Sequence, residues 1–280
     1  MLSRFERTIS EDSDTTAMPS TNEARRVLIC TTPRTAGHML CDMMGQAGWG
    51  NPTEYFHPDF ATRLYERWSG QKCSSVHLVR RNAKAYGEAL LKHRSFDSIF
   101  SAKIFFGDLA FAREAIGDED KTCCIYLTRR DKIEQTISLA ATLITKRPFD
   151  DETILENMPT LGETNTSTIS YLFRWLCEQE RHWREYFELT GRDDIVEIET
   201  ELLVARPTET LLSLSSALNL PLQGSLSDFP VASCGPYTID AAIKAELRGR
   251  YGSLLRHLAS EYSRDRRSEA DRRLNETQRD

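Results

Sequence analysis

Short apolar runs and helically spaced apolar residues alternate along the central part of the chain. Residues 26–31 form an apolar, β-branched run between polar stretches, which predicts a buried strand. Apolar residues then recur at helical spacing over residues 39–47, and Gly48 and Gly50 follow as stop signals. The pattern therefore predicts a strand, a loop and a helix in that order.

The same order of elements returns further along the chain. Residues 123–128 predict a second strand and residues 133–144 the helix after it. Residues 195–199 predict a third strand, which precedes a helix with Pro207 in its first turn. A further strand is expected over residues 99–106. Strands that alternate with helices predict an α/β fold in three layers, a parallel sheet flanked by helices.

The remaining segments set the expected domain limits. The clearest helix is expected over residues 167–189, whose apolar stripe is typical of a buried core. A shorter helix is expected around residues 83–92. The polar, acidic start, residues 1–25, predicts a disordered tail. Residues 26–263 are expected to form one domain, and residues 264–280 a charged C-terminal tail, either a solvated helix or disordered.

The composition is that of a soluble globular protein, with 40% hydrophobic and 28% charged residues in 280. The net charge of −6 argues against broad nucleic-acid binding, which requires a basic face, but allows a small anion held by a few arginines. The seven cysteines lack zinc-ligand spacing and are expected to be buried thiols in a reducing cytoplasm. No apolar run reaches the length of a membrane span. We therefore expect a cytoplasmic protein with no membrane span and no nucleic-acid partner.

The loop between the first expected strand and helix, residues 31–38, is a candidate anion site. Backbone N–H groups and the positive end of the helix dipole point into such a loop. Arg34 adds a planar guanidinium suited to phosphate or sulfate oxygens. A nucleotide-hydrolysing P-loop requires Gly-Lys-Ser/Thr, whereas Gly37 is followed by His38 and the triplet occurs nowhere in the chain. The loop thus predicts anion binding and disfavours ATP or GTP hydrolysis.

Four sequence blocks carry a family resemblance. They are Thr-Pro-Arg-Thr-Ala-Gly-His-Met-Leu (32–40), Gly-Asn-Pro-Thr-Glu-Tyr-Phe (50–56), Ala-Lys-Ile-Phe-Phe (102–106) and Arg-Arg-Asp-Lys-Ile-Glu-Gln-Thr-Ile-Ser-Leu (129–139). Their order and approximate separations resemble the trehalose 2-sulfotransferase type of bacterial sulfotransferase. Residues 199–211 are similar to a Y-E-x-L-x-x-D-P-x-x-x-L segment found across sulfotransferases. The resemblance implies a P-loop-like sulfotransferase fold and a donor, 3′-phosphoadenylyl sulfate (PAPS).

The resemblance also implies two anion sites for this donor. Residues in the positions that hold the 5′-phosphosulfate are Thr32, Arg34, Thr35, Gly37 and His38. The 3′-phosphate would be held by Arg129 and Ser138, which have the family's spacing of nine residues.

On the acceptor side, Glu54 stands where the family has its general base, in the pattern Gly-x-Pro-x-Glu-Phe/Tyr-Phe. A carboxylate there would take the proton of a hydroxyl that attacks sulfur. Arg34 and the loop amides would take up charge on the departing phosphate, so no metal is expected. Asn51, which replaces a glutamate of the trehalose enzyme, and Lys103 are further candidates for binding substrate. The acceptor is expected to be a carbohydrate or glycolipid-like compound, and the resemblance is consistent with a homodimer.

The phosphosulfate loop departs from the family at Thr35-Ala36-Gly37, where the family has Ser-Gly-Ser. This change keeps one hydroxyl, deletes the other and is expected to move the flexible glycine position by one residue. Two other functions stay open: a nucleotide-dependent phosphotransferase that uses the same loop, and a non-catalytic binding protein that retains the fold, for which this departure is the best evidence.

Some of the candidate residues also have plainer interpretations. Arg129 could be an ion-pair partner of Asp131, and Glu54 a surface carboxylate in a turn. His38 could cap the first turn of its helix, and the Ser138 hydroxyl could bond a carbonyl one turn back.

Overall fold

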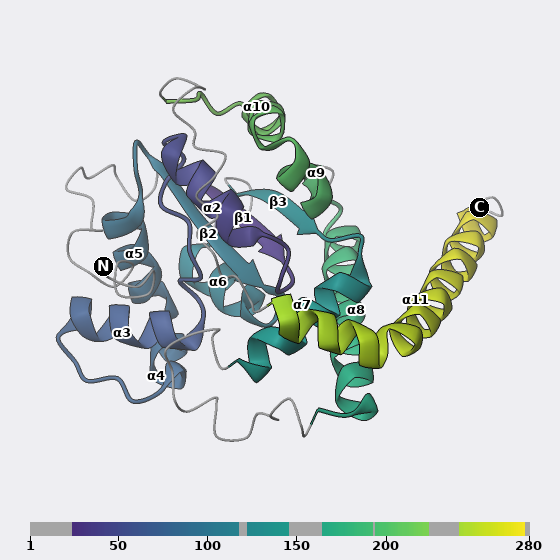
Figure 1. The fold of residues 1–280 in the computed structure, drawn as a ribbon. Helices are drawn as coiled ribbons and strands as arrows, with labels where there is room; N and C mark the ends of the chain where they lie inside the picture. Colours follow the sequence, from purple (N-terminus) through teal and green to yellow (C-terminus); the bar gives the residue numbers. More distant parts are fainter. Residues whose placement is uncertain (1–23, 118–121, 146–163, 193, 224–240, 278–280) are drawn as a thin grey trace. The chain divides into compact units, whose positions relative to one another are not determined.

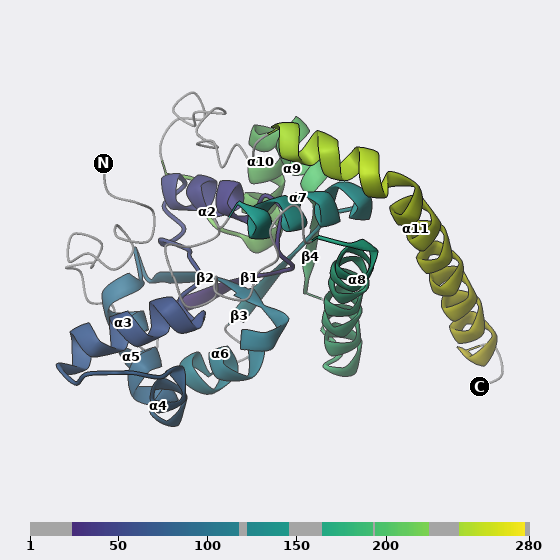
Figure 2. The ribbon, with the colours of Figure 1, turned by 60° about the horizontal axis from the view of Figure 1, so that its bottom comes forward.

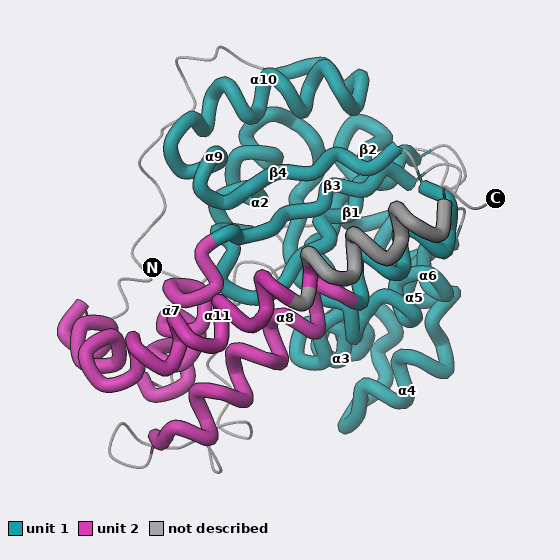
Figure 3. Tube along the Cα trace, turned by 90° about the vertical axis from the view of Figure 1, so that its right-hand side faces the viewer, with its two compact units in different colours: residues 1–130, 182–235 teal, residues 131–181, 236–280 magenta. Residues whose placement is uncertain are grey.

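The computed structural model describes residues 24–117, 122–145, 164–192, 194–223 and 241–277 (Figure 1). The chain divides into two compact units (Figure 3). The first comprises residues 1–130 and 182–235, and the second residues 131–181 and 236–280. The expected N-terminal tail lies outside the described residues up to residue 23, and the limits expected for the domain and its two tails stay predictions.

Four parallel strands form the sheet of the first unit. They are β1 (Arg25–Thr31), β2 (Ile99–Phe105), β3 (Thr122–Thr128) and β4 (Val196–Glu199), in the order β2-β1-β3-β4. All four strands were expected from the apolar runs, and their positions are confirmed within one or two residues. Thr31 pairs with Phe105 on one side and with Leu127 on the other, so the strands end together at one edge.

Alternate residues of β1 face opposite sides of the sheet, as expected of a strand buried on both faces. Leu28 and Cys30 pack with the helices of one layer, and Val27 and Ile29 with those of the other. Figure 2 shows the two layers on either side of the strands. The first layer contains α3 (Pro58–Ser69), α4 (Val76–Arg81), α5 (Ala83–Arg94) and α6 (Leu109–Ile116), and the second α2 (Gly37–Gln46), α9 (Thr200–Ala205) and α10 (Pro207–Leu218). The predicted three-layer α/β fold is confirmed.

Helix α3 is one element that the apolar pattern did not predict, and residues 241–263, which begin the last helix, are another. His57 is the N-cap residue of α3, Pro58 occupies its first turn, and Gly70 follows it in the left-handed region at φ 70°. These are ordinary start and stop signals, so the helix was readable from the sequence. Helices α4, α6 and α9 were not predicted either, because six to eight residues carry too few periods.

A segment without regular structure runs along the outer edge of β2. The Ser101 hydroxyl donates a hydrogen bond to the Trp49 carbonyl, and the Lys103 N–H donates one to the Thr53 carbonyl at 2.9 Å. Gly50 lies between Trp49 and Thr53 in the sequence and has φ 83°. A Cβ on Gly50 would lie 3.1 Å from the backbone nitrogen of Ser101. Glycine therefore allows both the turn and the close approach, and the segment brings the next residue, 54, beside the strand.

The second unit is helical. Its helices are α7 (Lys132–Ile144), α11 (Ala241–Thr277) and the first part of α8 (Thr166–Leu189), whose last residues belong to the first unit. Ile137, Phe173 and Leu255 lie in their shared apolar core. The helices expected over residues 133–144 and 167–189 are confirmed, and residues 264–277 continue α11.

Six cysteines fall within the described residues, and all six are free thiols. Five are buried and Cys123 is half-buried, while Cys234 lies outside the described residues. None of the described helices combines the length and the apolar character needed to cross a membrane.

Candidate active site

The candidate site lies at the carboxyl ends of β1 and β3. The chain leaves β1 for β2 on one side of it and then crosses to β3 on the other side. The adjacent strand ends therefore form a switch point, where open α/β sheets bind their ligands. The loop of residues 32–36 follows β1 at this point, and Arg129 follows β3.

The loop after β1 owes its shape to two residues in the left-handed region, Arg34 at φ 68° and Ala36 at φ 56°. Gly37 is the first residue of α2 and has no positive φ. The expectation that the flexible position moves to Gly37 is therefore wrong, because the left-handed turn stays at residue 36 and an alanine occupies it. Ala36 is also the N-cap residue and has no side-chain acceptor, so no cap side chain competes for the first N–H groups of α2.

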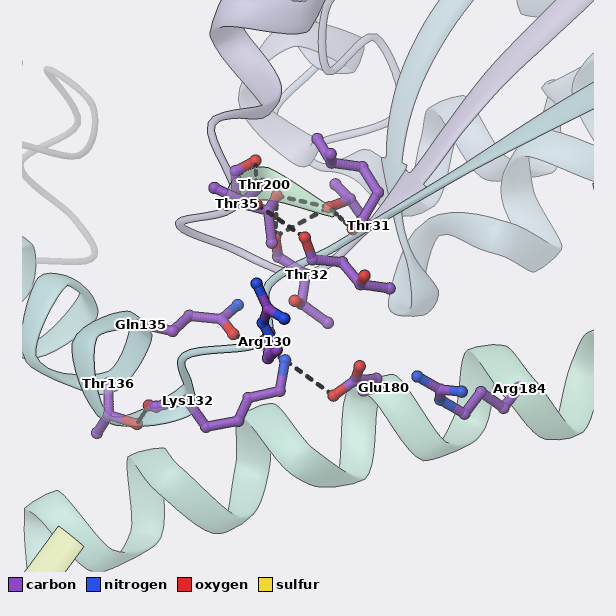
Figure 4. A network of polar contacts seen from close by, with 12 residues as sticks. Thr31, Thr32, Thr35, Arg130, Lys132, Gln135, Thr136, Glu180, Arg184 and Thr200 are labelled. Carbon is purple, nitrogen blue, oxygen red and sulfur yellow. Dashed lines mark hydrogen bonds and ion pairs between the residues drawn. The ribbon is translucent and has the colours of Figure 1, made fainter. Parts of the chain in front are cut away.

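Threonine hydroxyls fix the base of this loop (Figure 4). The Thr35 hydroxyl lies 2.6 Å from that of Thr31 and donates to the Thr32 carbonyl at 3.0 Å. The Thr200 hydroxyl lies 2.8 Å from the carbonyl oxygens of both Thr35 and Thr128. These contacts tie the loop to β3 and to the end of β4. Thr32 and Thr35, two of the predicted donor ligands, are both buried.

Arg129 reaches this loop from the end of β3. Its Nη1 donates a hydrogen bond to the Arg34 carbonyl at 3.0 Å. The structure therefore brings together the two arginines that were expected at opposite ends of the donor. Arg130, the next residue, has an exposed side chain that approaches the Glu199 carboxylate at 3.7 Å.

Glu54 is buried, with 2% of its surface exposed, so its interpretation as a surface carboxylate is wrong. Its Oε1 forms an ion pair with the Lys103 ammonium, which is also buried. His38 Nε2 lies 3.3 Å from the ammonium nitrogen and 3.7 Å from Glu54 Oε1. Glu54 Oε2 is buried and has no hydrogen-bond partner among the described residues. The structure thus brings three predicted residues from three separate segments into one cluster.

The residues that follow Glu54 anchor it in the core. Tyr55 and Phe56 are fully buried under the sheet. The Tyr86 hydroxyl donates to the Tyr55 carbonyl at 2.7 Å, and the Tyr55 hydroxyl donates to the Asn51 carbonyl at 2.5 Å. Asn51 itself is exposed, and no hydrogen bond joins its side chain to Glu54 among the hydrogen bonds of the described residues. The aromatic pair of the motif therefore acts as an anchor for the carboxylate.

A second carboxylate near this cluster, Asp108, was not among the predicted residues. It ends the short 3₁₀ turn of residues 106–108 that follows β2 and is buried, with 8% of its surface exposed. Burial raises the pKa of Asp108 to about 6, the His57 and Arg80 charges oppose the rise, and the Glu54 charge adds to it. Within the described residues, no three His, Cys, Asp or Glu side chains are placed to hold a metal ion together.

A family model matches residues 26–228, more than half of the chain, and it describes the Stf0 sulphotransferases. The chain belongs to the Stf0 sulphotransferase family. The resemblance drawn from the four sequence blocks is confirmed at this level, while the trehalose 2-sulfotransferase type stays a prediction. Membership of the Stf0 family assigns the chain to enzymes that transfer sulfuryl groups. The three layers of the chain, a parallel sheet with helices on both faces, form the P-loop-like sulfotransferase fold.

Solved sulfotransferase structures share a modest likeness with this chain. A sulfotransferase domain from the curacin biosynthetic pathway is 12% identical, with 71% of this chain and 75% of that chain covered and a TM-score of 0.45. The sulfotransferase STF9 from Mycobacterium avium is 12% identical, with 82% and 68% covered and a TM-score of 0.44. The sulfotransferase domain of the Synechococcus PCC 7002 olefin synthase is 12% identical, with 83% and 90% covered and a TM-score of 0.43. No curated protein sequence matches the chain.

Ser138, the remaining predicted donor ligand, lies on α7 in the second unit and is buried. The Thr142 hydroxyl donates to the Ser138 carbonyl at 2.8 Å. The Stf0 motif around Ser138 also contains Lys132, whose ammonium lies 2.8 Å from Glu180 Oε2 and donates to Gln135 Oε1 at 3.0 Å (Figure 4). A buried ion pair thus joins the start of α7 to α8. The pairing of Ser138 with Arg129 in one phosphate site stays a prediction.

Sequence reasoning missed two residues that shape the Stf0 loop. Thr200 holds the Thr35 carbonyl from 165 positions away, and the Trp183 indole N–H donates to the Thr31 carbonyl at 3.0 Å. Trp183 was assigned to an apolar core stripe, which is correct for its ring but leaves out its polar end. Thr200 stands inside the segment similar to other sulfotransferases, so its position was a usable signal.

Proposed function

We propose that this chain transfers a sulfuryl group from PAPS to a hydroxyl of a carbohydrate or glycolipid-like acceptor, with Glu54 as the general base. Family membership supports the reaction class. The observation that carries the proposal is the Glu54 carboxylate, whose Oε1 is held by Lys103 while Oε2 has no partner among the described residues. A buried oxygen left over in this way is suited to a hydroxyl proton.

The proposed reaction is an in-line displacement at sulfur. The acceptor oxygen forms a bond to sulfur while the bond from sulfur to the bridging phosphate oxygen breaks. The acceptor proton passes to Glu54, and the electron pair of the broken bond stays on the phosphate of 3′-phosphoadenosine 5′-phosphate. Negative charge therefore develops on the phosphate, where Arg34 and the first N–H groups of α2 are proposed to stabilise it.

Donor binding is proposed at the loop after β1 and at the end of β3. Thr32, Thr35, Gly37 and His38 would surround the 5′-phosphosulfate, and Arg129 with Ser138 the 3′-phosphate. Helix α2 is ten residues long, and no side chain caps its first N–H groups. These N–H groups and the arginines at the switch point fit a polyanionic ligand. Two localised cationic sites are compatible with an acidic chain, because they act at short range.

The acceptor and the assembly are proposed from the resemblance. Trehalose is one carbohydrate to test, although Asn51 removes a charge that the trehalose enzyme has at this position. A homodimer is proposed on the same ground. The free cysteines among the described residues support a reducing compartment such as the bacterial cytoplasm.

The test combines nucleotide binding with sulfuryl transfer. Isothermal titration should show binding of 3′-phosphoadenosine 5′-phosphate and none of ATP with magnesium; the reverse result would favour a phosphotransferase, and no binding of either a non-catalytic protein. Transfer from ³⁵S-labelled PAPS is then measured over a panel of sugars and glycolipids. Glu54→Gln should bind the nucleotide normally and lose transfer about 100-fold or more, whereas Glu88→Gln, an exposed carboxylate on α5, should keep both. Unchanged turnover in Glu54→Gln would reject its role as the base.

A further inference from the structure

Lys103 reaches Glu54 by a path that crosses the start of α2. A Cβ on Gly37 would lie 2.9 Å from Lys103 Cδ and 3.7 Å from Nζ. The first distance is shorter than real carbon contacts allow, so a side chain at residue 37 would displace the lysine stem. The absent side chain of Gly37 is therefore the space that the stem occupies.

Helix geometry gives no other reason for this glycine. Gly37 has no positive φ, so the backbone at this first position of α2 does not require a glycine. The left-handed turn that favours glycine is at the preceding residue, where the chain has Ala36. The glycine at residue 37 is therefore explained by the space that the Lys103 side chain needs and not by the backbone conformation of the loop.

The contacts of the ammonium group fix its orientation. A lysine ammonium has three donors and no acceptor, so it donates to Glu54 Oε1 and to His38 Nε2. The contact with His38 therefore requires the tautomer in which Nε2 carries no proton. Two of three donors of Lys103 are engaged within the cluster, one by the proposed base Glu54 and the other by His38, which is proposed to bind the donor.

Burial makes this lysine important to the carboxylate. A buried carboxylate without a countercharge takes up a proton and can no longer act as a base, because burial disfavours its ionised form. An opposite charge in contact favours the ionised form, whereas the negative charge of an ionised Asp108, which interacts with Glu54, disfavours it. The side chains of Glu54 and Lys103 are 3% and 5% exposed, so water screens the pair little.

We infer that Lys103 is a positioning residue that keeps Glu54 ionised and turns its free oxygen, Oε2, toward the acceptor, and that Gly37 provides the passage for its stem. The inference rests on the proposed function only in naming Glu54 as the base. It separates Lys103 from the residues that bind the donor, which is the other role open to a lysine at this edge of the sheet.

Carbon-13 NMR of protein labelled at the glutamate carboxyl carbons tests this inference without an acceptor. The signal of Glu54 is assigned by its loss in Glu54→Gln, and its protonation midpoint is followed with pH. In Lys103→Met the midpoint should rise by about one pH unit or more, since an opposite charge in contact is removed. Gly37→Ala should move it in the same direction by displacing the stem. Lys84→Met, the same change at an exposed lysine of α5, should leave it in place.

Each outcome distinguishes the inference from the proposed function. An unchanged midpoint in Lys103→Met, or a ten-fold loss of nucleotide affinity without a shift, overturns the inference and makes Lys103 a donor ligand. A shifted midpoint in a protein that transfers no sulfuryl group keeps the inference and rejects the function. If Lys103→Met does not fold, Gly37→Ala and Lys103→Arg decide: a shift in Gly37→Ala that is absent in Lys103→Arg supports the inference, and no shift in Gly37→Ala overturns it.

Discussion

The guanidinium of Arg129 holds the backbone carbonyl of Arg34, a residue in the left-handed region, through a 3.0 Å hydrogen bond. The end of β3 therefore supports the loop that follows β1. A residue predicted to bind the 3′-phosphate also helps to shape the site proposed for the 5′-phosphosulfate.

This contact makes the effect of Arg129→Ala ligand-dependent. A hydrogen bond to a charged group contributes about 1.5–3 kcal/mol, so affinity for 3′-phosphoadenosine 5′-phosphate should fall about 10- to 100-fold. Adenosine 5′-phosphosulfate, which lacks the 3′-phosphate, should lose only a few-fold through the loosened loop. Titration calorimetry with both ligands measures the difference, and Arg130→Ala is the exposed control. Equal losses for both ligands would contradict a 3′-phosphate role.

Ala36→Gly should stabilise the protein. Ala36 lies in the left-handed region at φ 56°. This conformation destabilises the fold by about 1–2 kcal/mol for an L-residue but not for glycine. The free energy of unfolding from urea titration should rise by about 1 kcal/mol. Ala245→Gly, at an exposed position inside α11, should lower it by about the same amount. A loss of stability in both variants would mean that the turn at residue 36 carries no strain.

Asp108 should make stability fall as pH rises. Its pKa is about 6 in the folded chain and about 3.9 when unfolded, so the folded state holds the proton between these values. Relative to Asp108→Asn, the wild-type protein should lose stability from about pH 4 to pH 6 and then level off, by an amount on the order of 3 kcal/mol.

Urea unfolding at pH 4.5 and 7.5 measures this dependence. The advantage of Asp108→Asn should be larger at pH 7.5, while Glu114→Gln, an exposed carboxylate on α6, the helix that follows Asp108, should show no such trend. An advantage that is independent of pH would show that Asp108 does not titrate in this range.

The buried pair of Lys132 and Glu180 should show strong coupling. Removal of one partner leaves a buried charge, so Lys132→Met should cost about 3 kcal/mol of unfolding free energy. The double variant Lys132→Met/Glu180→Leu should recover most of this loss, since two apolar side chains replace two charges. A double-mutant cycle by urea unfolding tests the coupling, and additive losses would show that the pair does not interact in solution.

The sheet was predictable because its strands are local patterns. The apolar runs that contain Val27, Ile29 and Ile125 are short, β-branched and bounded by polar residues, and each becomes a strand with both faces covered. The region from residue 51 to residue 98 was harder to interpret, since its helices are short and its aromatic residues pack at several angles. Only α5 was expected there, around residues 83–92, and the capping signals of α3 were overlooked.

The geometry of the candidate site could not be predicted from the sequence. Glu54 and Lys103 were each selected, but their ion pair depends on the segment that runs along β2, which no periodicity marks. The family pattern suggested that the glycine had exchanged places with its neighbour. Only the structure shows that the left-handed turn kept its position, and that the new glycine accommodates a side chain 66 positions away.

The stretch that carries Glu54 also occupies the outer edge of β2, where the Thr53 carbonyl accepts the Lys103 N–H. An uncovered edge strand exposes hydrogen-bonding groups that recruit strands of other molecules. One short peptide segment therefore positions the carboxylate and also covers the strand edge against aggregation. A bulky residue at Gly50 would push this peptide off the strand, and the expected phenotype is an insoluble protein in place of a soluble, inactive one.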